Sequence, residues 1–155
     1  MKLIRYFLQS IFIIFLFLLF KILGLKLSKT FSRFIFKIVG PLFRSKKISY
    51  SNLNIAFPKF SDSQNEKVID GMWETYSKIF AEYIFLKDFR CSPKFSKKII
   101  IENQKKLENI KQSKMPVIFI SGHFDNFELM AMHIEKSGID LAAIYRPLNN
   151  IFLNP

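Results

Sequence analysis

The stretch PVIFISGHFDNFELMAMHIEKSGIDLAAIY, residues 116 to 145, decides the fold that we expect of this chain. Residues 117 to 120 form a short β-branched and aromatic run that is typical of a buried strand. Residues 127 to 136 are predicted to be a helix, and Gly138 stands where that helix would stop. Residues 141 to 145 form the next predicted strand. A strand, tight loop, helix and strand in about 30 residues predict a βαβ unit with a right-handed crossover.

The rest of the chain is expected to be mainly helical. The strongest helical signal lies in residues 61 to 86, where apolar side chains recur at spacings of three and four. Either Ser61 with Gln64, or Ser63 with Glu66, has the spacing of a capping box. A mostly exposed helix is predicted for 95 to 113. The expected fold class is therefore α/β: a membrane-anchor helix, further helices, and the first βαβ unit of an incomplete, mainly parallel sheet.

Basic residues are concentrated in the first part of the chain. Residues 1 to 61 hold 11 Lys or Arg and no Asp or Glu, whereas residues 62 to 155 hold 13 basic and 12 acidic side chains. A segment that is both basic and apolar suits an anionic cytoplasmic leaflet, where each nearby cation contributes about 1 kcal/mol. Nucleic acid would also attract such charge, but it would leave the apolar residues unexplained. We expect a membrane as partner and no nucleic acid.

Residues 6 to 20, YFLQSIFIIFLFLLF, form an uncharged apolar run. As a helix this run is about 22 Å long, shorter than the roughly 30 Å hydrocarbon layer, although Lys21 could snorkel and lengthen it. A secretory signal peptide is an alternative, but no small-x-small cleavage site follows. We expect an uncleaved membrane anchor in residues 1 to 27, which either spans the bilayer or lies in its interface.

Residues 31 to 43, FSRFIFKIVGPLF, alternate apolar clusters with Arg33 and Lys37, and Gly40 and Pro41 are expected to break the run. One interpretation is a basic amphipathic helix at the membrane interface. The other is a core helix with two solvated cations.

Metal and disulfide chemistry is not expected. Cys91 is the only cysteine, so an intramolecular disulfide and a cysteine-based metal cluster are both impossible. A zinc site needs at least three protein ligands. His123 and His133 are the only histidines, and His133 is predicted to be structural.

His123 and Glu128 form a candidate catalytic pair. His123 follows the first predicted strand, where open α/β sheets place their ligand crevices. Glu128 lies at the predicted helix start, where the helix dipole favours a carboxylate. In a tight loop Glu128 could hold one ring N–H while the other ring nitrogen accepts a hydroxyl proton. The alternative is a loop histidine and a carboxylate that serves only the dipole.

Several segments appear in the order found in one known family. They are the N-terminal anchor, NLNIAFP at 52 to 58, MWETYSKIFAEY at 72 to 83, GHFDNFE at 122 to 128 and YRP at 145 to 147. On these motifs the sequence resembles the lipid A biosynthesis acyltransferases, the lauroyl and myristoyl transferase family. The resemblance makes residues 28 to 155 the N-terminal part of a truncated acyltransferase domain, which we expect to be inactive alone.

The resemblance also implies a reaction. An acyl chain would pass from an acyl carrier protein thioester to a hydroxyl of a lipid A precursor, at the cytoplasmic face of the bacterial inner membrane and without metal or cofactor. His123 would be the general base, Glu128 its partner and Arg146 a substrate-binding residue. Asn126 matches the family's Asn, with capping as its expected role, but Asp125 departs from the small residue, often Gly, expected there. The alternatives are acylation of another glycolipid or lysophospholipid, and a non-catalytic basic membrane-binding module.

Overall fold

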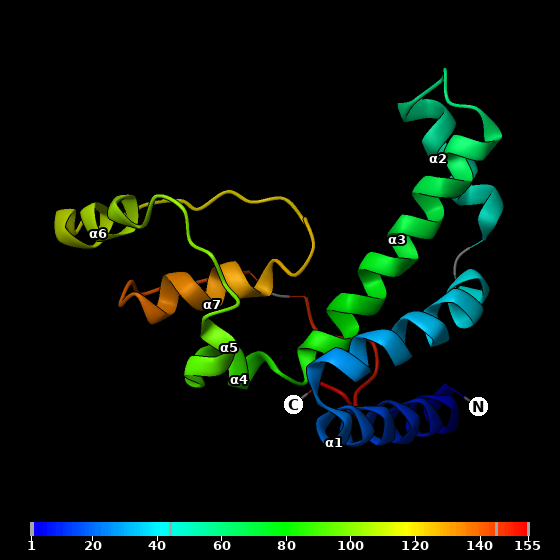
Figure 1. The fold of residues 1–155 in the computed structure, drawn as a ribbon, viewed down its shortest axis with the longest axis horizontal. Helices are drawn as coiled ribbons and strands as arrows, with labels where there is room; N and C mark the ends of the chain where they lie inside the picture. Colours follow the sequence, from blue (N-terminus) through cyan, green and yellow to red (C-terminus); the bar gives the residue numbers. More distant parts are fainter. Residues whose placement is uncertain (1, 44, 145, 155) are drawn as a thin grey trace. The chain divides into compact units, whose positions relative to one another are not determined.

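The computed structural model describes residues 2–43, 45–144 and 146–154, the side chain of residue 43 excepted. These residues form two compact units, one of residues 20–84 and one of residues 1–19 together with 85–155. The helices, labelled in Figure 1, are α1 (Lys2–Phe43), α2 (Lys46–Ala56), α3 (Asp62–Tyr83), α4 (Leu86–Cys91), α5 (Pro93–Ser96), α6 (Gln104–Ser113) and α7 (Glu128–Lys136).

The predicted α/β fold with its βαβ unit and parallel sheet is wrong, because no strand occurs among the described residues. Residues 117–120 and 141–144 have no regular secondary structure, and Tyr145 lies outside the described part. Both segments line a cavity of about 720 Å³, and Ile118 and Ile144 are exposed. β-branched composition favours a strand only where a neighbouring strand supplies hydrogen bonds and apolar contacts. The two segments do not supply them to each other here.

The long helix α1 is interrupted at Gly24, whose φ of 74° and ψ of 164° are not helical. The Ser28 hydroxyl lies 2.9 Å from the carbonyl oxygen of Phe20 and 2.8 Å from that of Gly24. The rings of Phe20 and Phe31 are 6.3 Å apart. In a straight helix eleven residues would span about 16 Å, so the chain after Gly24 folds back toward Phe20. We call residues 25–43 the second arm of α1.

The second arm packs against α3 through small residues. The buried Ser32 hydroxyl donates to the carbonyl oxygen of Ser77 at 2.8 Å. Gly40 lies so close to Trp73 that a Cβ there would be 2.6 Å from the indole ring. Contrary to the prediction, Gly40 and Pro41 do not end the helix, which continues to residue 43. Small side chains allow the two helix backbones to approach closely, so this face of residues 31–43 belongs to a core.

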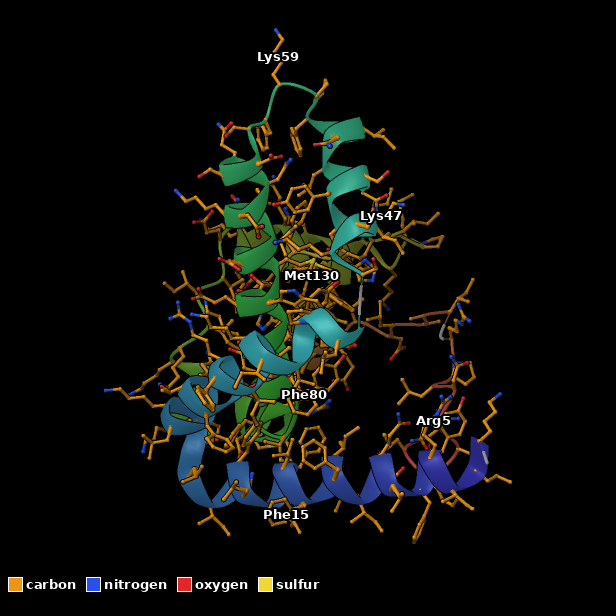
Figure 2. All side chains as sticks on the ribbon, turned by 90° about the vertical axis from the view of Figure 1, so that its right-hand side faces the viewer. Arg5, Phe15, Lys47, Lys59, Phe80 and Met130 are labelled. Atoms are coloured by element: carbon orange, nitrogen blue, oxygen red, sulfur yellow. The ribbon has the colours of Figure 1, made fainter. Side chains whose placement is uncertain are left out.

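Aromatic and ionic contacts complete this core. Phe80 of α3, labelled in Figure 2, has its ring centroid 6.0 Å from that of Phe20 and 5.4 Å from that of Phe36. Lys29 forms an ion pair with Glu82, which is itself buried. The second arm is therefore joined to α3 by apolar packing and by charge.

The turn between α2 and α3 contains the labelled Lys59 in Figure 2, and α2 lies beside the start of α3 in both views. The predicted capping box is confirmed, because Gln64 N donates to Ser61 Oγ at 3.3 Å and Ser61 N donates to Gln64 Oε1 at 2.8 Å. Buried Asn65 donates through its side chain to Asn54 at 2.8 Å. These polar contacts fix where α3 begins and hold α2 against it.

The other unit is organised around α4 and α7. Phe89 of α4 and Ile134 of α7 are buried. The observed bounds of α7 agree with the predicted helix, and Gly138 follows it with a φ of 80°. The helix predicted for 95–113 is wrong in its first part: α6 begins only at Gln104, after an irregular segment.

Residues near the two ends of the chain also meet within this unit. Asn150 donates through Nδ2 to the carbonyl oxygen of Tyr6 at 2.9 Å and accepts from Ser10 Oγ at 3.1 Å. The rings of Phe7 and Phe152 are 5.6 Å apart in an edge-to-face arrangement. The first turns of α1 are thus bound to residues 150–152.

Candidate functional site

The candidate site lies in residues 122–128, where an irregular segment leads into α7. His123 is exposed, and its ring centroid is 4.4 Å from that of Phe127 at an interplanar angle of 61°. Phe124 covers the backbone of Gly122, since a Cβ at Gly122 would be 2.5 Å from that ring. The segment is held by local aromatic contacts while the imidazole stays open to solvent.

Asp125 makes the turn of this segment tight. Its φ of 48° is in the left-handed region, which glycine adopts at least cost. Its carbonyl oxygen accepts from Phe127 N at 3.1 Å, and the carbonyl oxygen of Asn126 accepts from Leu129 N at 3.2 Å. The backbone conformation explains why a glycine would suit this position, and Asp is one of the few other residues that tolerate it.

The predicted side-chain cap of the helix is wrong. The residue that precedes α7 is Phe127 rather than Asp125 or Asn126, and no side-chain cap hydrogen bond forms at this end. Asn126 is instead buried, with only 8 % of its surface exposed. The buried amide therefore lies two residues before the start of α7.

Glu128 is the first residue of α7 and is partly buried. The carboxylate therefore belongs to the first helical turn, where the dipole favours negative charge. The structure brings His123 and Glu128 to the two sides of one tight turn. The ring contact that it shows for His123 is with Phe127, the residue before Glu128, so the imidazole–carboxylate pair stays a prediction.

The far end of α7 is attached to α4. Arg90 forms two hydrogen-bonded contacts with Glu135, Nη1 to Oε2 at 2.6 Å and Nη2 to Oε1 at 2.8 Å. The hydrogen bond and charge of Glu135 raise the pKa of Arg90 further above its ordinary value. Lys136 Nζ donates to the carbonyl oxygen of Arg90 at 2.7 Å. We call the paired contacts between Arg90 and Glu135 the Arg90 clamp. The sequence did not predict it, because the two residues are 45 positions apart and no local pattern joins them.

Arg146 is exposed and lies outside the helices, directly after Tyr145, which is not among the described residues. Its assignment as a substrate-binding residue stays a prediction. The cavity of about 720 Å³ in the same unit is lined by residues 110–111, 114–119 and 138–142. It is therefore formed by the end of α6 and by the segments 114–119 and 138–142. His123, Glu128 and Arg146 do not line it.

A second cavity, of about 380 Å³, lies between the second arm of α1, α2 and α3. Its charged lining residues are Arg33, Lys37, Lys46, Glu66, Asp70 and Glu74. Arg33 Nη2 is 2.9 Å from a carboxylate oxygen of Glu74, and Lys46 forms an ion pair with Glu66. Because Arg33 pairs with Glu74 and Lys46 with Glu66, the cavity is a structural junction between three helices.

Two carboxylates that line this cavity, those of Glu66 and Glu74, have lowered pKa values. The pKa of Glu66 is lowered, first by the hydrogen bond from Lys46 and then by that from Tyr50. In return, the hydrogen bond to Glu66 raises the pKa of Tyr50 to about 12. The pKa of Glu74 is lowered mainly by Lys78, 3.1 Å away on the next turn of α3. The contacts of Glu66 with Lys46 and Tyr50 join α3 to α2, and no pattern along the chain indicated them.

Among the described residues, no group of three or more His, Cys, Asp or Glu side chains could hold a metal ion. Lys2–Leu42 is long and apolar enough to cross a membrane, by length and composition alone.

Comparison with known proteins places these features in context. The profile of the bacterial lipid A biosynthesis acyltransferases matches residues 1–155. Lipid A biosynthesis acyltransferase 2 of Shigella flexneri is 28% identical over 113 residues, which cover 72% of this chain and 36% of that relative. No solved structure matches the chain significantly.

Proposed function

Because this chain belongs to the bacterial lipid A biosynthesis acyltransferase family, we propose that it takes part in acyl transfer from an acyl carrier protein thioester to a hydroxyl of a lipid A precursor. The resemblance found in the sequence is confirmed by the match over residues 1–155. That match is the observation that carries the proposal. Acylation of another glycolipid or of a lysophospholipid would use the same chemistry on a different acceptor.

The proposed chemistry centres on His123. Glu128 holds the N–H of one ring nitrogen, and the other nitrogen accepts the proton of the acceptor hydroxyl. The hydroxyl oxygen attacks the thioester carbonyl carbon, and the carbon–sulfur bond breaks as the new ester bond forms. The imidazolium then returns its proton to the departing thiolate. The tight turn at Asp125 supports this arrangement, because it keeps the four residues between His123 and Glu128 compact.

Arg146 is proposed to bind an anionic or polar oxygen of a substrate. A guanidinium offers a planar fork of donors that suits a phosphate of the acceptor or the carbonyl oxygen of the donor. The exposure of Arg146 leaves its side chain accessible for such a ligand.

Attachment to the cytoplasmic face of the inner membrane is the third part of the proposal. Apolar side chains of α1 such as Phe15, labelled in Figure 2, are exposed along its first turns. They match the composition of a membrane anchor, for which we propose residues 1–27, with the acyltransferase part in residues 28–155. The break at Gly24 lies three residues before that division. An anchor would bring the site to a lipid acceptor that does not leave the bilayer.

The experiment compares His123→Ala and Glu128→Gln with His133→Ala, a control on the same segment. Because the 155 residues are expected to be inactive alone, each substitution is made in a protein of the relatives' full length. Membranes containing it are incubated with an acylated carrier protein and a lipid A precursor, and the product lipid is identified by mass spectrometry. We expect loss of product for His123→Ala, a strong decrease for Glu128→Gln and little change for His133→Ala. Full activity of His123→Ala would refute the proposed base, and a product built on a different lipid would reassign the acceptor.

A further inference from the structure

The second arm of α1 has an apolar face that does not contact α3. Five of its residues recur at spacings of four, three, four and four, and each is between 39 and 81 % exposed: Leu27, Phe31, Phe34, Ile38 and Leu42. At about 100° per residue they lie within an arc of about 80° on the helix. We call these five residues the outer stripe.

The outer stripe cannot turn inward, because the opposite face of the same helix is already occupied. Ser32 is hydrogen-bonded to the α3 backbone, Gly40 is closed off by Trp73, and the Phe36 ring is 5.4 Å from that of Phe80. Rotation of the helix about its axis would break all three contacts. The stripe is thus an outer surface of the unit of residues 20–84, although one edge of Phe31 also meets the ring of Phe20.

The charged residues near the outer stripe favour an anionic lipid surface over other partners. Lys26 and Lys37 are exposed beside one edge of it, about 100° to 120° round the helix from its centre. Lys37 also borders the cavity between α1, α2 and α3. Lysine stems of this kind lie along apolar surface while the ammonium groups reach outward. No Asp or Glu precedes Asp62 in the sequence, so the stripe has no acidic neighbour on its own helix. The other two cations of the arm, Lys29 and Arg33, are turned toward Glu82 and Glu74 of α3.

We propose that the outer stripe docks on an anionic phospholipid bilayer with the axis of residues 25–43 in the plane of the interface. The five apolar side chains enter the outer part of the acyl region, and Lys26 and Lys37 meet the lipid phosphates. This contact shares only Lys26 and Leu27 with the membrane anchor proposed for residues 1–27, and it does not depend on the acyl-transfer reaction. It fixes which face of the α1–α3 core is turned toward the lipid.

A local probe tests the proposal even if the anchor alone keeps the protein on membranes. Cys91 is exposed and is the only cysteine, so Cys91→Ser gives a background for single-cysteine labelling. Phe34→Cys places an environment-sensitive nitrobenzoxadiazole label on the stripe. Ile55→Cys is the matched control, because Ile55 is an exposed apolar residue of α2 in the same unit.

With vesicles that contain phosphatidylglycerol, we expect the label at position 34 to shift to the blue, to brighten several-fold and to be quenched by a nitroxide-labelled lipid. The label at position 55 should remain open to aqueous iodide. Equal iodide access at both positions would overturn the proposal. Shielding of position 34 without vesicles would also overturn it, because the stripe would then face a second copy of the chain.

A second comparison tests the cations. Lys26→Gln with Lys37→Gln should weaken the response of the label at position 34 to phosphatidylglycerol, relative to vesicles of phosphatidylcholine alone. Lys47→Gln with Lys59→Gln, which removes two exposed cations elsewhere in the unit, should not. An unchanged preference for anionic vesicles in the first pair would refute the proposed phosphate contact.

Discussion

Arg90 of α4 binds the carboxylate of Glu135 through both of its terminal nitrogens, with Nη1 2.6 Å from Oε2 and Nη2 2.8 Å from Oε1. Glu135 lies on α7, the helix that begins with Glu128. The clamp therefore holds the element that carries one member of the candidate catalytic pair.

In the same full-length background, Arg90→Ala is expected to decrease acyl transfer by a positioning effect, because α7 loses its attachment to α4. Small displacements of a reacting group can cost up to about 100-fold in rate. We expect a lower kcat with a smaller change in KM, and partial recovery in Arg90→Lys, which keeps the charge but not the fork. Lys87→Ala, an exposed substitution on the same helix, is the control. Wild-type kcat in Arg90→Ala would contradict the role of the clamp.

Gly24→Ala is expected to destabilise the unit of residues 20–84. The φ of 74° and ψ of 164° at Gly24 belong to a region that is essentially restricted to glycine, and strain of this kind costs about 1–3 kcal/mol. Gly71→Ala provides a contrasting control, because Gly71 lies inside α3 with nothing within 4 Å of a new Cβ. That substitution should stabilise by about 0.5–1 kcal/mol. Denaturant unfolding followed by circular dichroism in detergent measures both, and equal midpoints for the two variants would disprove the strain.

Gly40→Ala is expected to push the second arm away from α3, since the new methyl group would lie 2.6 Å from the Trp73 ring. Overpacking of a core typically costs about 1–3 kcal/mol. Trp73→Leu should lose apolar contacts alone but relieve the clash when combined with Gly40→Ala. A double-mutant cycle on the free energy of unfolding should therefore be non-additive, and simple additivity would show that the two residues do not meet.

The hydrogen bonds of Glu66 with Lys46 and Tyr50 are expected to make the free energy of unfolding depend on pH. The pKa of Glu66 is lower in the folded state than its ordinary value of 4.5, so its contribution is fully present above 4.5 and is lost as the pH falls through the folded value. Urea midpoints measured from neutral pH to pH 3 should show a steeper acid loss in the wild type than in Glu66→Gln. Glu102→Gln, an exposed carboxylate on an irregular segment, should follow the wild type. If the urea midpoints of the wild type and Glu66→Gln changed identically with pH, the Glu66 carboxylate would make no such contribution to stability.

Some features followed from the sequence because they are short-range. The capping box at Ser61 and Gln64, the extent of α7 and its stop at Gly138 all depend on backbone groups within a few residues of each other. The five ordered segments, GHFDNFE among them, indicated the family because the order of residues is itself the signal, and the match over residues 1–155 confirms it.

Only the tertiary structure decided the features that depend on distant partners. Residues 117–120 have strand composition, but a strand exists only where another segment completes its hydrogen bonds, so composition alone predicted a sheet that the described residues do not form. The fold-back at Gly24 and the outward face of residues 25–43 depend on contacts with α3, and the Arg90 clamp joins residues 45 positions apart. Local chemistry sets where helices start and stop, whereas the arrangement of their faces is set by contacts that have no pattern along the chain.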